Sequence, residues 1–484
     1  MSALKKFLII FCALLIVFLT ACQSLDIQAS PEDLMRPPAV DPEQNEIERV
    51  LRENVGNVRL KYPKRGNYRS AFITYDVDGD GQNEAIVFFA SDIQDSRVRI
   101  CILDKPNGEW ELMQHLGGEG TEVQEVNFQK FTDDYVNIVV GYESGDQLAL
   151  NDTIVVYSYR NDSPANAPYL RDIYREEYKQ IITLRRQERN YDELLVLNNS
   201  WVTDSDGAGM RSAAAVLVRY DEQEKALGKV SECNLSASSV DDSKIYIQEL
   251  DKDNFLAYID HVVDKNSIFT ESLVIKENSV RKAIRPESSQ RDDFFYTKRS
   301  AAFPTSDIDG DGKYEVPFTP DKSAAEIITD PLSRISDGWL VYVLWQELFW
   351  DDSVANKYVP KYRTVYNEPG QYFFIIPDGW LDFVSVRTSR EGREMIFSTK
   401  NTRSNSKDLL SVFAMEKGNE TVSVVPEGME LIAGTDGFDY YADALATYPV
   451  EHTMESTGKV IKLDVVSVPE ARELLMPKSK ITGP

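Results

Sequence analysis

The chain has 484 residues, with 79 acidic and 53 basic side chains that give a formal net charge of −26 at pH 7. This length predicts two or more domains. The acidity, which we interpret as a source of solubility, and the lack of a basic stripe with interleaved aromatic residues exclude nucleic acid as a partner.

The N-terminal segment, residues 1–21, has the pattern of a secretory signal peptide. Lys5 and Lys6 precede an uncharged apolar stretch over 7–19, and Leu19-Thr20-Ala21-Cys22 follows. The stretch is shorter than the ~20 apolar residues that a helix needs to span a bilayer. An ordinary signal peptide or a core helix is the alternative interpretation.

The motif that ends at Cys22 resembles the lipobox of bacterial lipoprotein precursors. The resemblance implies that Cys22 is diacylated on its sulfur and becomes the mature N terminus. We therefore expect an exported protein, lipid-anchored to the bacterial cell membrane through N-terminal acyl chains and facing outside the cytoplasm. Residues 22–40 are rich in Pro, Ser, Asp and Gln and are expected to form a tether.

Residues 41–59 are expected to contain a short amphipathic helix and a lead-in to the next unit. Ile47, Val50 and Leu51 form a narrow apolar stripe among charged residues. We expect this stripe to pack on the following domain or to end the tether. A helix that binds a partner is the alternative, and the narrowness of the stripe argues against it.

Two nine-residue segments carry the same acidic pattern, in which every second position offers an oxygen ligand. These positions are Asp76, Asp78, Asp80, Gln82 and Glu84 in the first segment, and Asp307, Asp309, Asp311, Lys313 and Glu315 in the second. Carboxylates at alternate positions of a glycine-containing turn can converge on Ca²⁺, which takes about six to eight oxygens, and the seventh position would contribute its backbone carbonyl. Apolar runs follow both segments, and Val87 and Phe318 stand where an EF-hand has its last glutamate. This context predicts a strand after each loop and argues against an EF-hand.

The two loops resemble the calcium-binding loops of FG-GAP and VCBS-type repeats, which form the blades of certain β-propellers. The resemblance implies Ca²⁺ as a structural cofactor at both loops. Apolar, β-rich runs also recur over 60–366 with a period of about 60 residues, and four short strands for each unit are what a propeller blade requires. The first runs of the five units lie at 71–75, 123–128, 181–184, 245–247 and 301–303.

We therefore predict a mainly β fold in which residues 60–366 form a five-bladed β-propeller. Six or seven blades are possible if the tail contributes, and a pair of β-sandwiches is the alternative. In a closed ring the first and last blades would be neighbours, so both acidic loops would lie beside one seam. Residues 367–484 are expected to form a small α+β domain, with helices at 437–445 and 469–475 and a strand at 460–463 between them.

The sequence offers few catalytic candidates. His115, His261 and His452 are scattered over separate units, and neither a His-Glu-x-x-His pair nor a Gly-x-Ser-x-Gly motif occurs. Cys101 and Cys233 are expected to be two small buried thiols, with one disulfide as the alternative. The aromatic residues of 339–350 are expected to pack between blades, with a sugar-stacking or protein-docking platform as the alternative.

These features favour a non-catalytic module that binds Ca²⁺ structurally and acts as a protein- or glycan-binding scaffold at the cell envelope. The alternative is a cell-envelope hydrolase of the glycoside type, which would use carboxylate catalysis on a propeller scaffold.

Overall fold

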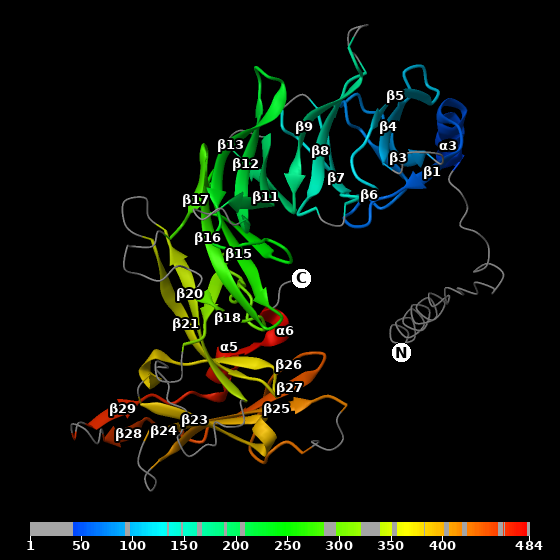
Figure 1. Ribbon diagram of the computed structural model, residues 1–484. Helices are drawn as coiled ribbons and strands as arrows, with labels where there is room; N and C mark the ends of the chain where they lie inside the picture. Colours follow the sequence, from blue (N-terminus) through cyan, green and yellow to red (C-terminus); the bar gives the residue numbers. More distant parts are fainter. Residues whose placement is uncertain are drawn as a thin grey trace, which may run out of the picture.

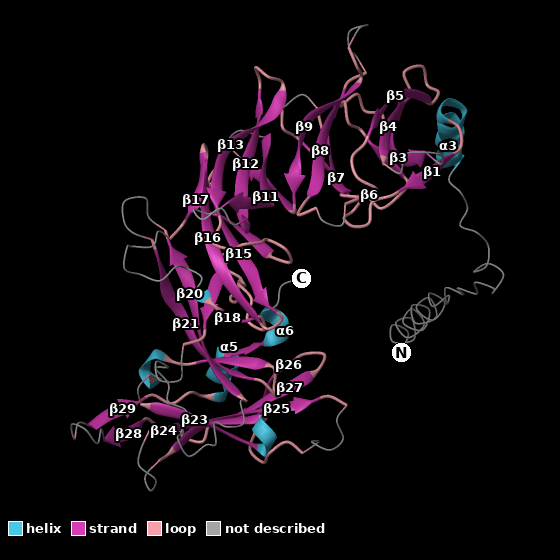
Figure 2. Ribbon diagram, in the orientation of Figure 1, coloured by secondary structure: helices cyan, strands magenta, loops and turns pink. Residues whose placement is uncertain are grey.

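Antiparallel β-sheets make up most of the protein (Figure 2). The computed structural model describes residues 42–91, 97–132, 135–146, 149–161, 167–187, 191–203, 209–284, 297–320, 339–350, 356–381, 383–400, 406–418, 424–453, 458 and 460–481. The predicted signal segment, Cys22 and the tether lie outside these residues. Within them, no helix is long and apolar enough to cross a membrane. The prediction of a mainly β protein is confirmed.

Five of the sheets follow one another along the chain, and most of their strands form antiparallel meanders. The first sheet holds β1 (Val58–Lys61), β2 (Phe72–Tyr75), β3 (Glu84–Ser91), β4 (Arg99–Asp104) and β5 (Glu111–Gly117). The second holds β6 (Glu122–Gln129), β7 (Asn137–Glu143), β8 (Asp152–Tyr159) and β9 (Leu170–Tyr178). The third holds β10 (Gln180–Arg186), β11 (Tyr191–Thr203), β12 (Gly209–Asp221) and β13 (Ala226–Asn234).

The fourth and fifth sheets continue this pattern with additional edge strands. The fourth holds β14 (Lys244–Glu249), β15 (Phe255–Asp264), β16 (Ser267–Lys276), β17 (Ser279–Lys282) and the short β18 (Arg299–Ser300). The fifth holds β19 (Glu315–Phe318), β20 (Leu340–Phe349), β21 (Lys357–Asn367), β22 (Tyr372–Ile375) and β30 (Leu475–Pro477).

Each sheet buries apolar side chains on both faces, and within the stack neighbouring sheets pack face to face. In the first sheet, Ile86 and Phe88 point toward the second sheet, where they meet Val140. In the third sheet, Val196 belongs to the core shared with the second sheet, and the adjacent Leu197 to the core shared with the fourth. Alternation along the strand therefore links the sheets into a stack in which each unit is stabilised by its neighbours.

The two ends of the stack are covered by other parts of the chain. Helix α3 (Pro42–Val55) places Ile47 and Leu51 against Val87 and Cys101 on the outer face of the first sheet, which confirms a helix that packs on the following domain. At the other end, Phe303 and Ile481 lie in one core with Val343, Trp345 and Phe373 of the fifth sheet.

The sheets form an open arc, with the first and fifth at opposite ends (Figure 1). The prediction of a ring closed between these two sheets is therefore not confirmed, and the acidic loops do not share a seam. The physical reason is that the outer faces of both end sheets are buried under α3 and under the 303 and 481 segments.

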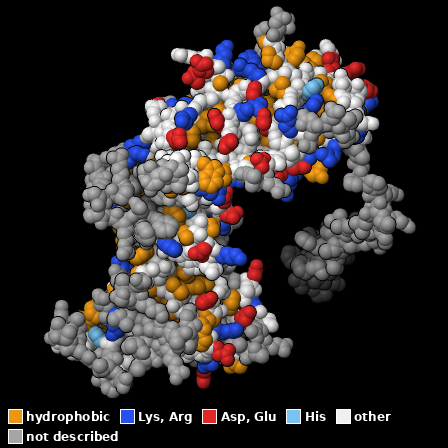
Figure 3. Space-filling view, viewed as in Figure 1, with side chains coloured by type: hydrophobic (Ala, Val, Ile, Leu, Met, Phe, Trp, Pro, Cys, Tyr) orange, Lys and Arg blue, Asp and Glu red, His pale blue; other side chains and the backbone are white. Residues whose placement is uncertain are grey.

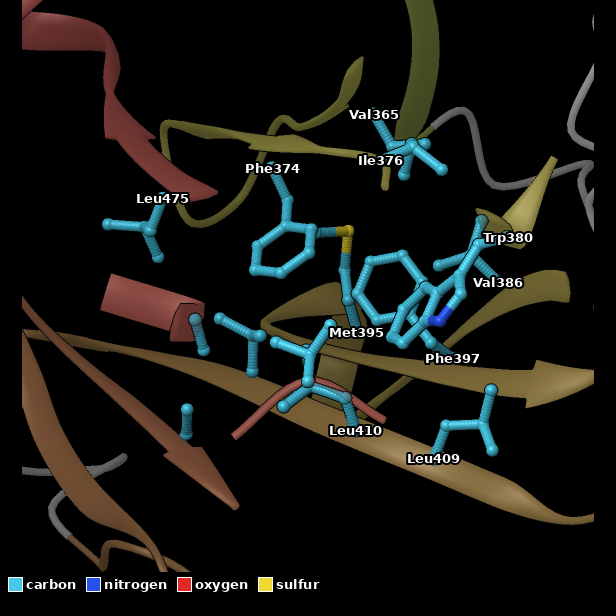
Figure 4. Packing of buried hydrophobic residues seen from close by; sticks show 14 of the residues in the cluster. Val365, Phe374, Ile376, Trp380, Val386, Met395, Phe397, Leu409, Leu410 and Leu475 are labelled. Atoms are coloured by element: carbon cyan, nitrogen blue, oxygen red, sulfur yellow. The ribbon is translucent and has the colours of Figure 1, made fainter. Parts of the chain in front are cut away.

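The C-terminal unit is built around a five-stranded antiparallel sheet. Its strands are β23 (Val384–Ser389), β24 (Glu394–Thr399), β25 (Asp408–Glu416), β27 (Phe438–Asp443) and β26 (Glu430–Gly434), beside the pair β28 (Val450–Thr453) and β29 (Val460–Leu463). The helical segments are η2 (Asp378–Trp380), η3 (Arg390–Gly392), α5 (Val468–Leu474) and α6 (Lys478–Ile481). Figure 4 shows its core, in which Trp380, Met395 and Phe397 meet Val365 and Phe374 of the fifth sheet. The unit therefore packs directly on the end of the arc.

Three sequence predictions in this part of the chain are wrong in detail. The expected helix at 437–445 is strand β27, in which Tyr440 and Ala442 alternate into the core. The expected strand at 301–303 is a turn after β18. The boundary expected after residue 366 falls inside the fifth sheet, because β22 pairs with β21 and is itself paired with β30 from the end of the chain. The helix at 469–475 and the strand at 460–463 are confirmed as α5 and β29.

Candidate cation sites in the two acidic loops

The first acidic loop connects β2 to β3 in the first sheet, where Tyr75 pairs with Glu84. The two carboxylate oxygens of Asp76 accept hydrogen bonds from the backbone N–H groups of Gly79, at 2.8 Å, and Gly81, at 3.1 Å. Both glycines have positive φ, which allows the chain to turn twice within this short loop. The main chain thus holds the acidic side chains on the inside of the turn.

Three carboxylates converge in this loop. Oxygens of Asp76, Asp78 and Glu84 all lie within 4.8 Å of one another. Glu84 is fully buried, and its Oε2 accepts a hydrogen bond from the Val77 N–H at 2.7 Å. Its Oε1 and Oδ2 of Asp78 are also buried, and neither has a hydrogen-bond partner among the described residues. Buried carboxylate oxygens without a partner are unfavourable, so this donor set fits a hard cation that binds oxygen.

Electrostatics at the first loop agree with that geometry. Burial raises the pKa of Glu84 to about 8, with further contributions from the charges of Asp78 and Asp104. Burial likewise raises the pKa of Asp78 to about 6, with repulsion from Asp80 and Asp104 adding to it. Without a cation, the protein therefore holds these carboxylates in a setting that disfavours their charge.

Asp104 is a buried acid near this loop that the sequence prediction did not include. It ends β4, next to Leu103, which pairs with Ala85 beside Glu84. Only 1% of Asp104 is exposed, and its Oδ2 accepts a hydrogen bond from the Tyr159 hydroxyl of the second sheet at 2.7 Å. An acidic residue directly after the four apolar residues 100–103 was the available signal. Of the predicted ligands, Asp80 lies in the turn outside the converging group, and its Oδ1 accepts a hydrogen bond from the Gln82 N–H at 2.7 Å.

The second acidic loop precedes β19 in the fifth sheet and repeats the same backbone geometry. Asp307 accepts hydrogen bonds from the Gly310 N–H at 2.7 Å and the Gly312 N–H at 2.9 Å. Glu315 is fully buried and accepts from the Ile308 N–H at 3.0 Å, as Glu84 does in the first loop. Both loops therefore enter a strand of an antiparallel sheet, as the sequence predicted.

The second loop differs because a lysine ammonium lies among its carboxylates. Lys361 Nζ, which comes from β21, is 2.9 Å from Asp309 Oδ2, 2.7 Å from Asp311 Oδ2 and 2.8 Å from Glu315 Oε1. The Tyr362 hydroxyl also donates to Asp309 Oδ2 at 2.8 Å. Burial acts to lower the pKa of Lys361, but the hydrogen bonds to Asp311, Glu315 and Asp309 outweigh it and raise the pKa well above its ordinary value. Lys313 pairs with Glu347 at 2.6 Å, an acid with a carboxylate oxygen that lies within 4.8 Å of oxygens of Asp311 and Glu315.

The other singled-out residues have structural surroundings. Cys101 and Cys233 are both free thiols; Cys101 is buried in the first sheet as expected, whereas Cys233 is only half-buried in the third, so the expectation of a buried thiol is wrong there. The three histidines lie on β5, β15 and β28, which do not form a common site. Trp345 is fully buried in the fifth sheet, and Trp350 packs between the fourth and fifth sheets, whereas Phe349 is 48% exposed.

Comparisons with known proteins identify no family. No family model matches the chain, and no curated protein matches it. Among solved structures, Sqt1 of Saccharomyces cerevisiae aligns with a TM-score of 0.28 and 10% identity over 80% of this chain and 99% of its own. The GH43 β-1,3-galactosidase BT3683 aligns with a TM-score of 0.21 and 9% identity over 62% and 96% of the two chains. A levansucrase variant from B. megaterium aligns with a TM-score of 0.22 and 9% identity over 66% and 88%. These low scores carry no argument about function.

Proposed function

We propose that this protein is an exported, lipid-anchored scaffold module of the bacterial cell envelope, which binds Ca²⁺ structurally and presents its stack of sheets to a protein or glycan partner. The observation that carries the calcium assignment is Glu84, a fully buried carboxylate whose Oε1 lacks a hydrogen-bond partner among the described residues and faces two further acids. The ligands would be Asp76, Asp78 and Glu84, with main-chain and solvent oxygens completing the shell.

The role of the ion in this proposal is to stabilise the β2–β3 connection rather than to take part in a reaction. A divalent cation would compensate for the burial of Asp78 and Glu84, and for the repulsion from neighbouring acids, which together raise their pKa values. It would also fix the edge of the first sheet, at the opposite end of the arc from the C-terminal unit (Figure 1). Weak sites of this kind fill where Ca²⁺ is abundant, which agrees with the export expected from residues 1–22.

Surface and core features support a binding module over a hydrolase. Glu193 and Asp260 are buried acids beside arginines, and each is paired, Glu193 with Arg186 at 2.6 Å and Asp260 with Arg299 at 3.1 Å. These carboxylates are buried inside the sheets and held in ion pairs, so a substrate cannot reach them. On the face seen in Figure 3, acidic and basic side chains are interspersed over the sheets, as on a soluble scaffold.

Calcium binding is tested by thermal unfolding with Ca²⁺ and with a chelator. A site with a Kd of about 0.1–1 mM would stabilise the protein by about 1.4–2.7 kcal/mol at about 10 mM Ca²⁺. We expect the chelator to lower the melting temperature of the wild type but not that of Glu84→Gln, which removes the buried charge and keeps the shape. Glu46→Gln, an exposed position on α3, is the matched control and should respond like the wild type. If chelation leaves the wild-type melting curve unchanged, the calcium assignment fails.

Anchoring and partner binding need separate measurements. Cys22→Ala should move the protein from the membrane fraction to the soluble exported fraction, because it removes the sulfur that would carry the acyl chains. Membrane retention of this variant would contradict lipid anchoring. Pull-down from an envelope extract with the wild type and with Glu84→Gln would then identify the partner and show whether its binding depends on the first loop.

A further inference from the structure

The two acidic loops have the same backbone but differ in charge at their centres. We propose that Lys361 is the built-in cation of the second loop, so that the chain binds one divalent ion, at the first loop, and holds the second loop with its own ammonium group. This inference rests on the calcium site proposed for the first loop and corrects the expectation of two equivalent calcium sites.

The distances at Lys361 carry the first step. An ammonium group has three N–H donors, and Asp309, Asp311 and Glu315 each place a carboxylate oxygen 2.7–2.9 Å from Nζ. A calcium ion bonds its oxygens at about 2.3–2.6 Å. At the positions equivalent to its proposed ligands in the first loop it would use Asp307, Asp309 and Glu315, and two of these, Asp309 and Glu315, already hold the ammonium. The ammonium and the ion therefore compete for one position.

The strand register carries the second step, because it identifies the residue that replaces Lys361 in the first sheet. In the fifth sheet, Lys361 is the extra residue of a β-bulge, where Trp345 pairs with Tyr362 and Gln346 with Pro360. In the first sheet a bulge occurs at the matching place, where Ile102 pairs with Gln114 and Leu103 with Leu112, and its extra residue is Met113.

This equivalence follows from the pairing of the preceding strand as well. Ala85, next to Glu84, pairs with Leu103, and Val316, next to Glu315, pairs with Gln346. Leu103 in turn pairs with Leu112, which precedes Met113, and Gln346 pairs with Pro360, which precedes Lys361. The same path across the strands therefore leads from Glu84 to Met113 and from Glu315 to Lys361. The first loop thus has an uncharged thioether at the position from which the second loop receives its positive charge.

The charge balance at the two loops completes the argument. In the second loop, Lys361 pairs with Asp309, Asp311 and Glu315, and none of these forms an ion pair with another cation of the described residues. A fourth acid, Glu347, lies 3.9 Å from Lys361 and pairs with Lys313. In the first loop, Asp76, Asp78 and Glu84 make no ion pair with any lysine or arginine of the described ranges, and two of their buried oxygens lack partners. Only the first loop therefore needs a cation from solution.

The test is the number of Ca²⁺ ions bound by the full-length protein and its variants, measured by isothermal titration calorimetry and by metal analysis after equilibrium dialysis. We expect one ion for the wild type, two for Lys361→Met and none for Met113→Lys. These two substitutions exchange the residues that the register makes equivalent, so each serves as the control for the other. Lys361→Met should also lose stability in a chelator and recover it in Ca²⁺, because its second loop has exchanged an internal cation for an external one.

The outcomes separate this inference from the calcium site on which it rests. Two ions in the wild type would overturn the role of Lys361 and leave the first site in place. One ion in a folded Lys361→Met protein would also overturn it, whereas no ion in the wild type would refute the proposed function at the first loop. If Lys361→Met fails to fold, two single variants that keep Lys361 locate the bound ion. Asp311→Asn should still bind one ion, and Asp78→Asn should bind none. The reverse pattern would place the ion in the second loop and refute the proposal.

Discussion

Helix α3 is expected to act as the cap of the open end of the stack, and Leu51→Ala tests this. Leu51 is fully buried against the outer face of the first sheet. Truncation of a buried leucine to alanine costs about 2–5 kcal/mol, and the lower half of this range applies where the surroundings can relax. Because the helix lies at the end of the stack, we expect a loss of about 2–3 kcal/mol, confined to the first sheet. This corresponds to a rise of about 30- to 160-fold in local opening.

The assay is hydrogen exchange read by mass spectrometry, which resolves one sheet from another. Peptides from β3 and β4 should exchange faster in Leu51→Ala, while peptides from β20 and β21 should keep their wild-type protection. Glu46→Ala is the control, because Glu46 is exposed on the same helix and its replacement should change stability by less than about 0.5 kcal/mol. Unchanged exchange in β3 and β4 would show that α3 is not a cap. Equal acceleration in every sheet would refute the idea that the units are stabilised only by their neighbours.

Three further predictions concern the core and the links between sheets. Burial acts to raise the pKa of Glu271, but the His261 imidazole, whose Nε2 lies 3.4 Å from Glu271 Oε2, and the Lys282 ammonium lower it. The stabilising contribution of Glu271 is therefore present above the unfolded pKa of about 4.3 and is lost as pH falls through the folded value. Urea titrations should show a smaller acid-induced loss of stability for Glu271→Gln than for the wild type, and equal losses would contradict this. In Gly120→Ala, the new methyl group would clash with the main-chain carbonyl of Glu143 in the second sheet, at a residue with positive φ, so the free energy of unfolding should fall by more than about 2 kcal/mol. Gly108 also has positive φ but lies in open space, so Gly108→Ala should cost about 1 kcal/mol. Equal melting temperatures of the two variants would refute the steric argument. Arg186→Met removes one ion-pair partner of the buried Glu193 and should lower the free energy of unfolding by about 3–5 kcal/mol, measured by denaturant unfolding. A loss below about 1 kcal/mol would show that the protein does not need this ion pair.

The sequence predicted most of the strands because they are buried on both faces. Such strands are continuous apolar runs, and those at β3, β8 and β12 were found for that reason. Helix α5 was found where local chemistry is strong, since Ser467 and Glu470 form a capping box at its start. The segment at 437–445 was assigned the wrong period, although its buried residues alternate as in a strand.

The parts of the candidate sites that were missed depend on contacts between strands. Asp76, Asp78 and Glu84 could be found because their spacing along one loop is enough to bring their oxygens together. Lys361 reaches the second loop from β21, and only the pairing of β19, β20 and β21 places it there. A β-bulge shifts the alternation by one residue, so periodicity alone gives the wrong face for such a side chain.

Because the sheets form an open arc and the two acidic loops differ in charge, we expect the two ends of the stack to be stabilised independently. A closed ring would require the outer faces of the first and fifth sheets to bury each other, but Leu51 already covers one and Ile481 the other. The same sequence cannot bury these faces twice, so the two acidic loops act at separate ends of the stack. Lys361 supplies a positive charge to the loop next to the C-terminal unit independently of the medium, whereas in our proposal the first loop takes its cation from solution. The stability of the α3 end should therefore follow the Ca²⁺ concentration, while that of the fifth sheet should not.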